Sequence, residues 1–119
     1  MASSLTYNTH FERFLLVGMS QAEDPRTGRA VTGVYFSLSS DLIHWSSRRL
    51  LLTGDRPETH TCDGPDPFLY PAILDPRSPS RNFDTTGQRT YLYFTRFNYT
   101  ACRMTTDRDL VRIAVEFSR

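Results

Sequence analysis

The apolar residues of this chain follow a period of two or gather in short runs, and they form no sustained stripe with helical spacing. The clearest example is the segment 110–117, where Val111, Ile113, Val115 and Phe117 alternate with polar or small residues. Such alternation places one side of a strand in a core and the other side near solvent. Gly, Pro, Asp and Thr gather between the apolar runs and predict turns and loops. The pattern therefore predicts an all-β chain.

Individual strands can be placed from the same pattern. Segments 14–19 and 31–38 are expected to form a hairpin, because Asp24-Pro25 initiates a turn and Gly28 tolerates a positive φ. Further strands are expected over 50–52, 69–74, 90–97 and 110–117, and loops over 53–68 and 75–88. The 119 residues are enough for one compact domain.

Composition and charge exclude several classes of function. Fourteen basic side chains, all of them arginine, face 13 acidic ones, so the formal net charge is +1. This balance argues against a nucleic-acid partner and against an anionic membrane surface. No apolar stretch approaches the roughly 20 residues of a membrane helix, and the first residues do not resemble a secretory signal. No membrane partner is expected, and the localisation stays open.

The two cysteines, Cys62 and Cys102, are too few for a disulfide framework and lack metal-ligand spacing. We expect free thiols at both positions. We also expect no metal and no other cofactor.

A short internal repeat suggests how the strands are organised. Segments 41–45 and 109–113 share the pattern Asp-Leu-aliphatic-polar-apolar, and residues 5–8 correspond to residues 68–71. Two repeated units of strands are typical of propeller blades. We therefore predict two four-stranded antiparallel blades, forming part of a five-bladed β-propeller. The first blade is expected over about 4–53 and the second over about 68–119, with a loop over 54–67 between them.

The segment 37–46 contains Ser-x-Asp-Leu-x-His-Trp after a strand that ends in Tyr-Phe-Ser. It resembles the blade motif of the five-bladed propeller glycoside hydrolases of families 43 and 32 and of related uncharacterised secreted bacterial proteins. Segments 70–75, 91–96 and 107–112 look like the final blade and C-terminus of such proteins. The resemblance implies the C-terminal part of a carbohydrate-active propeller, in a family whose members are mostly extracellular or periplasmic.

The motif also has a physical interpretation. Its Ser and Asp oxygens are expected to accept hydrogen bonds from backbone donors of the turn. His44 is then expected to be hydrogen-bonded locally. Trp45 is expected to fill the gap between adjacent sheets, where its large surface stabilises most.

Glycoside hydrolysis requires two carboxyl groups, one protonated and one ionised. Glu12, Glu23 and Glu116 are expected to be solvated surface residues. The segment 58–66, which holds Glu58, could face a central cleft, although an exposed, turn-rich loop is the favoured interpretation. No catalytic pair is assigned, and the chain by itself is expected to lack glycosidase activity.

The candidate ligand-binding residues are Tyr7, Asn8, Tyr70, Asp63 and Asp66. The first residues of each innermost strand face the pocket in the propellers that the chain resembles. Tyrosine can stack on a sugar ring, and an Asn amide can donate to and accept from sugar hydroxyls. Packing between blades is the alternative role for both tyrosines.

Two accounts of function remain open at this point. In one, the chain forms part of the pocket wall of a carbohydrate-active parent. In the other, it is a non-catalytic glycan-binding or structural blade pair that oligomerises to close a ring. Both leave sheet faces to be covered, either by the missing blades of a parent chain or by other copies. Arg96 could reach an acidic sugar, although a surface ion pair is the favoured interpretation.

Overall fold

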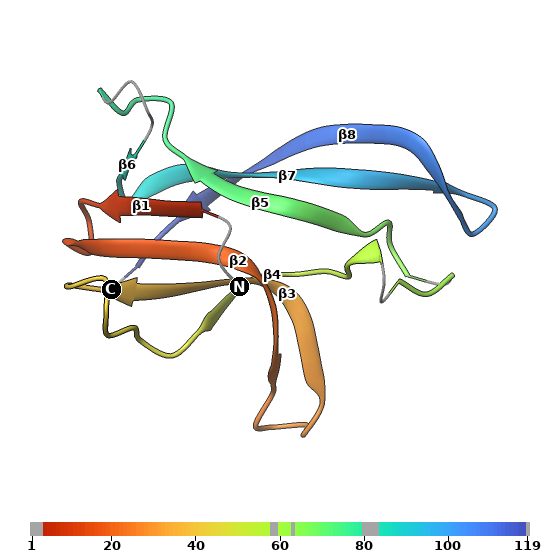
Figure 1. Ribbon diagram of the computed structural model, residues 1–119, viewed down its shortest axis with the longest axis horizontal. Helices are drawn as coiled ribbons and strands as arrows, with labels where there is room; N and C mark the ends of the chain where they lie inside the picture. The colour runs from red at the N-terminus through yellow and green to blue at the C-terminus, as the bar shows by residue number, and fades with distance from the viewer. Residues whose placement is uncertain (1–3, 58–59, 63, 80–83, 119) are drawn as a thin grey trace.

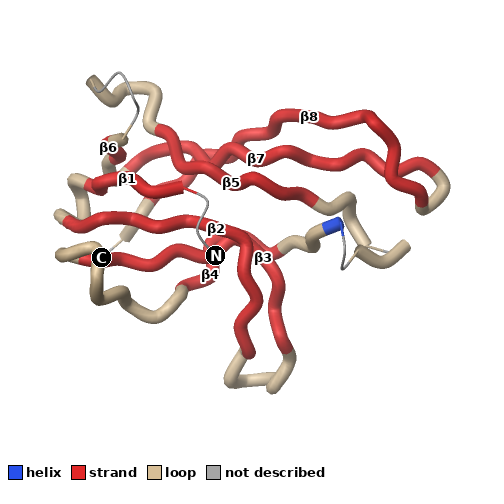
Figure 2. The backbone as a smooth tube through the Cα atoms, viewed as in Figure 1, coloured by secondary structure: helices blue, strands red, loops and turns tan. Residues whose placement is uncertain are grey.

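The computed structural model describes residues 4–57, 60–62, 64–79 and 84–118. Within these residues the chain is all-β, as the sequence predicts, and nearly every element is a strand (Figure 2). The strands are β1 (Ser4–Asn8), β2 (Arg13–Glu23), β3 (Ala30–Ser39), β4 (Arg49–Thr53), β5 (Phe68–Leu74), β6 (Thr85–Thr86), β7 (Arg89–Thr100) and β8 (Arg103–Glu116). They form a five-stranded sheet in the order β4-β3-β2-β1-β6 and a three-stranded sheet in the order β5-β7-β8 (Figure 1).

The first four strands form a consecutive antiparallel meander, β1 to β4. The predicted hairpin over the first long apolar runs is confirmed as β2 and β3, which pair from Phe14–Ser39 to Glu23–Ala30. Its turn closes through the carbonyl of Asp24, which accepts a hydrogen bond from the Gly28 N–H at 2.8 Å. Gly28 has a φ of 69° there, a conformation that glycine adopts without a steric penalty.

The three-stranded sheet is dominated by the long hairpin of β7 and β8, which pair from Arg89–Glu116 to Thr100–Arg103. The strand β8 begins well before the expected position 110. The hairpin turn consists of Ala101 and Cys102, with φ angles of 49° and 65°. Two positive φ angles are typical of the type I′ turn, which usually contains Asn or Gly. Neither residue type is present, so the sequence carries no signal for this turn.

The predicted strand counts of the two blades, four and four, are wrong because of the strand β6. This short strand, in a segment expected to be a loop, pairs in parallel with β1 through Tyr7–Thr85 and Asn8–Thr86. The sheets consequently contain five and three strands. A two-residue strand between Asp84 and Gly87 has no apolar alternation, so sequence patterns could not place it.

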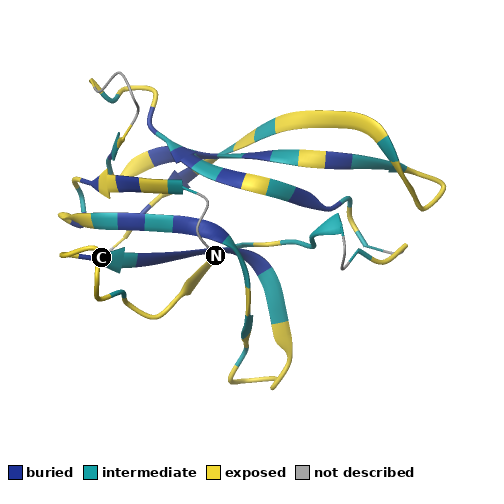
Figure 3. Cartoon of the chain, viewed as in Figure 1, coloured by how far each residue is buried: buried dark blue, intermediate teal, exposed yellow. Residues whose placement is uncertain are grey.

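The two sheets together curl like a half-barrel around one core (Figure 1). The strand β5 lies against β2 and β1, and the Ser4 hydroxyl accepts a hydrogen bond from the Ile73 N–H at 3.2 Å. Buried residues alternate with more exposed ones along β1, β5 and much of β7, five consecutive residues of β3 are buried, and β8 is largely exposed (Figure 3). The buried apolar cluster consists of Phe11, Leu15, Val17, Val34, Phe36, Phe68, Ile73, Leu92, Phe94, Val115 and Phe117.

The internal repeat is only partly reflected in the fold. The segments 5–8 and 68–71 lie in β1 and β5. These strands pair antiparallel with β2 and β7, respectively. The segments 41–45 and 109–113 differ, however. The first is a turn after β3, and the second lies in the middle of β8, where Asp109 pairs with Arg96. The shared letters at these two places therefore do not mark equivalent positions.

Candidate functional site

The first predicted site residues, Tyr7 and Asn8, lie at the end of β1. Tyr7 is 39% exposed and lines a small hollow of about 260 Å³ together with Leu5, Phe14 and Asp84. Asn8 is fully buried instead. Its amide nitrogen donates to the Thr86 hydroxyl at 3.1 Å and to the Gly87 carbonyl at 3.0 Å, and its oxygen accepts from the Phe11 N–H at 2.9 Å. The Asn8 amide thus fastens β6 to β1, and a role in ligand binding stays a prediction.

The other predicted site residues lie apart from this hollow. Tyr70 is 69% exposed in β5, beside a register shift and with a φ of 59°. The strands β1 and β5 run side by side in the same direction (Figure 1), and Ser4 contacts Ile73. Tyr7 follows Ser4 by three residues and Tyr70 precedes Ile73 by three, so the two tyrosines lie toward opposite ends of this pair. Asp66 is half-buried in the loop before β5, and Asp63 lies outside the described residues. The structure therefore does not bring the two tyrosines together.

The loop before β5 is attached to the tip of the β7–β8 hairpin by a disulfide between Cys62 and Cys102. The expectation of free thiols is therefore wrong. The two residues are 40 positions apart and in different elements, so their spacing gave no hint of the pairing. Nearby, the rings of His60 and Tyr99 meet edge to face with their centroids 4.4 Å apart. Glu58, the carboxylate that could have faced a cleft, lies outside the described residues.

The predicted capping of the Ser-Asp turn is confirmed. The Ser39 hydroxyl accepts hydrogen bonds from the N–H groups of Asp41 and Leu42, at 3.2 and 2.9 Å. One oxygen of Asp41 accepts from the N–H groups of Ile43 and His44, at 2.9 and 2.8 Å. The other lies 2.7 Å from Nδ1 of His44, so His44 is a local turn residue as expected.

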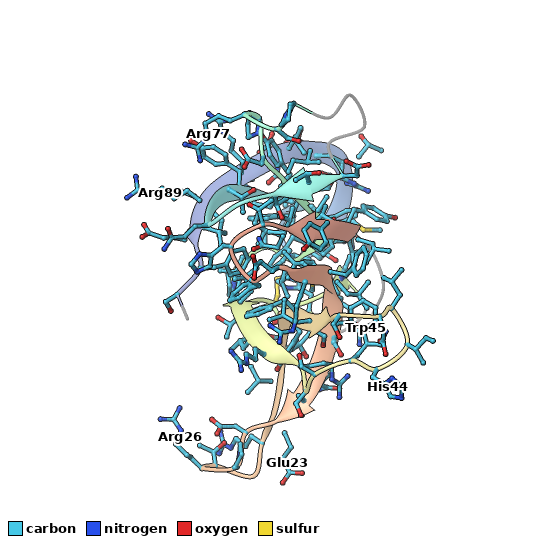
Figure 4. All side chains as sticks on the ribbon, turned by 90° about the vertical axis from the view of Figure 1, so that its left-hand side faces the viewer. Glu23, Arg26, His44, Trp45, Arg77 and Arg89 are labelled. Carbon is cyan, nitrogen blue, oxygen red and sulfur yellow. A yellow bond between two sulfur atoms is a disulfide. The ribbon has the colours of Figure 1, made fainter. Side chains whose placement is uncertain are left out.

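Trp45 does not occupy the position expected of it. It is half-buried in the turn between β3 and β4 and is not part of the buried cluster (Figure 4). The strand β4 lies at the edge of its sheet, and the turn before it is exposed apart from Trp45.

Replacing Asp41 with asparagine is expected to lower the Tm slightly at pH 7. The hydrogen bond from the His44 ring, followed by the backbone N–H groups of His44 and Ile43, lowers the pKa of Asp41 below its usual value of 3.8. A lowered pKa means that the stabilisation is complete above pH 3.8 and is lost as the pH falls through the folded-state value. Thermal unfolding at pH 7, 5 and 3 should show the difference shrinking only below about pH 4. Ser40→Ala, in the same exposed turn, is the control, and a pH-independent difference would contradict this account.

Arg96 forms the surface ion pair that the sequence favours. Its Nη2 lies 2.7 Å from Oδ2 of Asp109, and Asn98 donates to the same oxygen at 3.0 Å. The hydrogen bond from Asn98, followed by that from Arg96, lowers the pKa of Asp109. Arg96 is thereby engaged within the β7–β8 hairpin.

An open groove of about 650 Å³ lies at the end of the three-stranded sheet where β7 begins and β8 ends. We call it the arginine groove, and its principal lining residues are Arg77, Arg89, Tyr91, Arg112, Val115 and Glu116. Arg77 and Arg89 extend from the same side of the molecule, far from the β2–β3 hairpin that carries Glu23 and Arg26 (Figure 4).

The floor of the arginine groove consists of an arginine stacked on a tyrosine ring, on the outer face of β7 and β8. The guanidinium of Arg112 lies over the Tyr91 ring, 4.2 Å from its centroid, and donates to the Tyr93 hydroxyl at 3.3 Å. This hydrogen bond raises the pKa of Arg112, so the group stays charged. Tyr93 lies opposite Arg112, and Tyr91 lies opposite Ala114. The stack therefore follows from the strand register, which makes Arg112 and Tyr91 diagonal neighbours.

The walls of the groove carry the other two guanidinium groups. Arg89 approaches Glu116 at 3.6 Å, and both side chains are mostly exposed. Arg77 donates to the Arg89 carbonyl at 3.0 Å and lies 3.6 Å from the buried carboxylate of Asp75. Three guanidinium groups thus converge on one hollow.

None of these groove residues was predicted from the sequence as part of a site. Arg89 and Arg112 meet because β7 and β8 pair in one register, and Arg77, in the loop after β5, reaches them through its hydrogen bond to the Arg89 carbonyl. The one available signal was the alternation of Tyr91, Tyr93, Arg112 and Ala114 on the non-core positions of two strands, which resembles an ordinary solvated face.

No cluster of His, Cys, Asp and Glu among the described residues could hold a metal ion. In the same part of the chain, no helix has the length and apolar character needed to cross a membrane. Comparison of the chain with family models, curated proteins and solved structures finds no match. Any function must therefore be argued from the residues themselves.

Proposed function

We propose that this chain is a carbohydrate-binding part of a larger propeller-like protein, and that sugar binds in the arginine groove. The observation that carries the proposal is the Arg112–Tyr91 stack on the groove floor, 4.2 Å from guanidinium to ring centroid. A guanidinium presents several N–H donors in one plane, and stacking on Tyr91 orients that plane. Neighbouring hydroxyls of a sugar, or a carboxylate, can accept two such hydrogen bonds at once.

The size and composition of the groove support this function. Its volume of about 650 Å³ falls within the range of small-molecule sites, about 300–1,000 Å³. Tyr91 and the exposed Ala114 offer apolar surface for the C–H groups of a sugar, and Glu116 offers an acceptor for its hydroxyls. The floor residues stand on paired strands, which hold them more rigidly than a loop would.

The carboxylates support binding rather than hydrolysis by this part of the protein. Glu116 is the carboxylate that lines the groove among the described residues, and Asp75 behind it is buried and faces Arg77. A glycosidase needs two carboxyl groups on either side of the scissile bond. We therefore assign no catalytic pair, and we propose that any catalytic residues belong to other parts of a parent protein.

The outer face of the three-stranded sheet supports membership in a larger assembly. Tyr70 and Leu110 are 69% and 75% exposed there. A further sheet, from a parent chain or from another copy, would cover such side chains, as in a propeller. The two successive antiparallel meanders are compatible with blades. The disulfide supports an oxidising compartment, in line with the mostly extracellular or periplasmic family that the sequence resembles.

Calorimetric titration of oligosaccharides into the purified chain tests the proposal. Binding is expected, and Tyr91→Ala should weaken it about tenfold or more because the support of Arg112 is lost. Tyr70→Ala and Tyr7→Ala are the matched controls and should leave the affinity unchanged. A loss in either control instead of Tyr91→Ala would move the site to the residues predicted from sequence. Absence of binding to every sugar tested would overturn the proposal.

Light scattering on the same samples gives the oligomeric state, which tests whether other copies of the chain cover the outer face. A monomer is expected if the missing blades belong to a parent chain, whereas a discrete trimer would indicate that copies close a ring.

A further inference from the structure

The arginine groove holds more positive than negative charge, and one of its cations forms no ion pair within the described part of the chain. Arg89 faces Glu116 and Arg77 faces Asp75, each at 3.6 Å. Arg112, in contrast, contacts the neutral Tyr93 hydroxyl and the Tyr91 ring, and it forms no ion pair with a carboxylate of the described residues. The groove therefore has an unneutralised guanidinium at its floor.

The carboxylate partners of Arg77 and Arg89 hold these two side chains only weakly. The side chains of Arg89 and Glu116 are 72% and 61% exposed, and that of Arg77 is 71% exposed. At 3.6 Å these contacts are longer than a charge-assisted hydrogen bond, which is about 2.7–2.9 Å. An anion entering the groove could therefore recruit Arg77 and Arg89 without breaking a strong interaction.

We infer that the ligand of the arginine groove is an acidic sugar, whose carboxylate binds Arg112 and is flanked by Arg77 and Arg89. This inference rests on the proposed carbohydrate-binding function and specifies its ligand class. A carboxylate matches the planar fork of a guanidinium and accepts two parallel hydrogen bonds from it. The sugar ring would lie along Tyr91 and Ala114, with Glu116 accepting from a hydroxyl.

Two ligands of the same size, one with free carboxylates and one without, test whether the carboxylate is recognised. Calorimetry would compare a trimer of galacturonic acid with the same trimer methyl-esterified at its carboxyl groups, at low and at moderate salt. The acidic trimer is expected to bind at least about tenfold more tightly, because its hydrogen bonds from arginine are charge-assisted. Raising the salt should reduce this preference, because the site is open to solvent.

Variants of the groove test which residue produces the preference for the acidic trimer. Arg112→Gln should abolish the preference for the acid, and Arg112→Lys, which keeps the charge but not the fork, should restore it only in part. Arg26→Gln is the matched control, because Arg26 is an exposed arginine at the tip of the distant β2–β3 hairpin (Figure 4). Thermal unfolding of each variant verifies that it is folded. If Arg112→Gln does not fold, Arg89→Gln, which removes a wall cation, should weaken the preference.

Each outcome has a separate meaning. Equal binding of the acid and its ester would overturn the inference while leaving carbohydrate binding intact. Absence of binding by both would overturn the proposed function as well. A preference that survives Arg112→Gln would place the acid elsewhere on the molecule. Displacement of the acid by an equal concentration of inorganic sulfate would identify a simple anion site and likewise overturn the inference.

Discussion

Replacement of Leu92 by alanine is expected to lower the free energy of unfolding by about 2–5 kcal/mol. Leu92 has no exposed surface and lies in the middle of β7, paired with Ile73 on one side and Ile113 on the other. Its side chain belongs to the cluster that joins the two sheets. Truncation removes buried apolar surface and leaves a cavity that rigid paired strands cannot close. A domain stabilised by about 5–15 kcal/mol would lose a large fraction of its stability.

The matched control is Leu110→Ala, on the partner strand β8. Leu110 is 75% exposed, so its truncation should change the free energy of unfolding by no more than about 0.5 kcal/mol. Urea denaturation followed by fluorescence measures both variants. Equal losses in the two would show that the sheets do not pack through the face that carries Leu92.

Replacing both cysteines with serine is expected to destabilise the chain by about 2–4 kcal/mol. The disulfide joins residues 40 positions apart. Closing a loop of that length removes about 4 kcal/mol of chain entropy from the unfolded state in the simple loop model, and measured values are often smaller. The bond also holds the loop before β5 against the tip of the β7–β8 hairpin. Hydrogen exchange in that loop should therefore accelerate more than exchange in β2.

Two measurements verify the account of the disulfide. Alkylation of the unreduced protein in denaturant should leave its mass unchanged, because both thiols are bonded. Reduction of the wild type should reproduce the lower stability of the double serine variant. Rapid alkylation without reductant would show free thiols and would contradict the pairing.

Local patterns predicted the strands well where apolar residues alternate or run together. The hairpin of β2 and β3 and the capped turn at Ser39 and Asp41 were predictable because their signals lie within a few residues. The patterns failed where the conformation is set from outside the segment. The strand β6 exists because Asn8 and Thr86 hydrogen-bond across 78 positions, and no local property of Thr85 and Thr86 implies it.

The candidate site was less predictable than the fold. Tyr7 and Tyr70 were chosen from their places at the starts of expected inner strands, and the structure places them apart. The arginine groove depends on the register of β7 and β8, which brings Arg112 beside Tyr91 and Arg89 beside Glu116. A shift of one residue would turn Arg112 to the other face of the sheet. Arginines on exposed faces look alike in a sequence, so only their convergence marks a site.

The sequence by itself determined that this chain is all-β, where most of its strands lie and which side of each strand is apolar. These properties follow from side-chain periodicity and turn chemistry, which act over a few residues. The tertiary structure alone decided that the sheets contain five and three strands, that Cys62 meets Cys102, and that three arginines surround one groove. Each of these depends on contacts between residues far apart in the chain, whose partners are selected by packing and register rather than by any local preference.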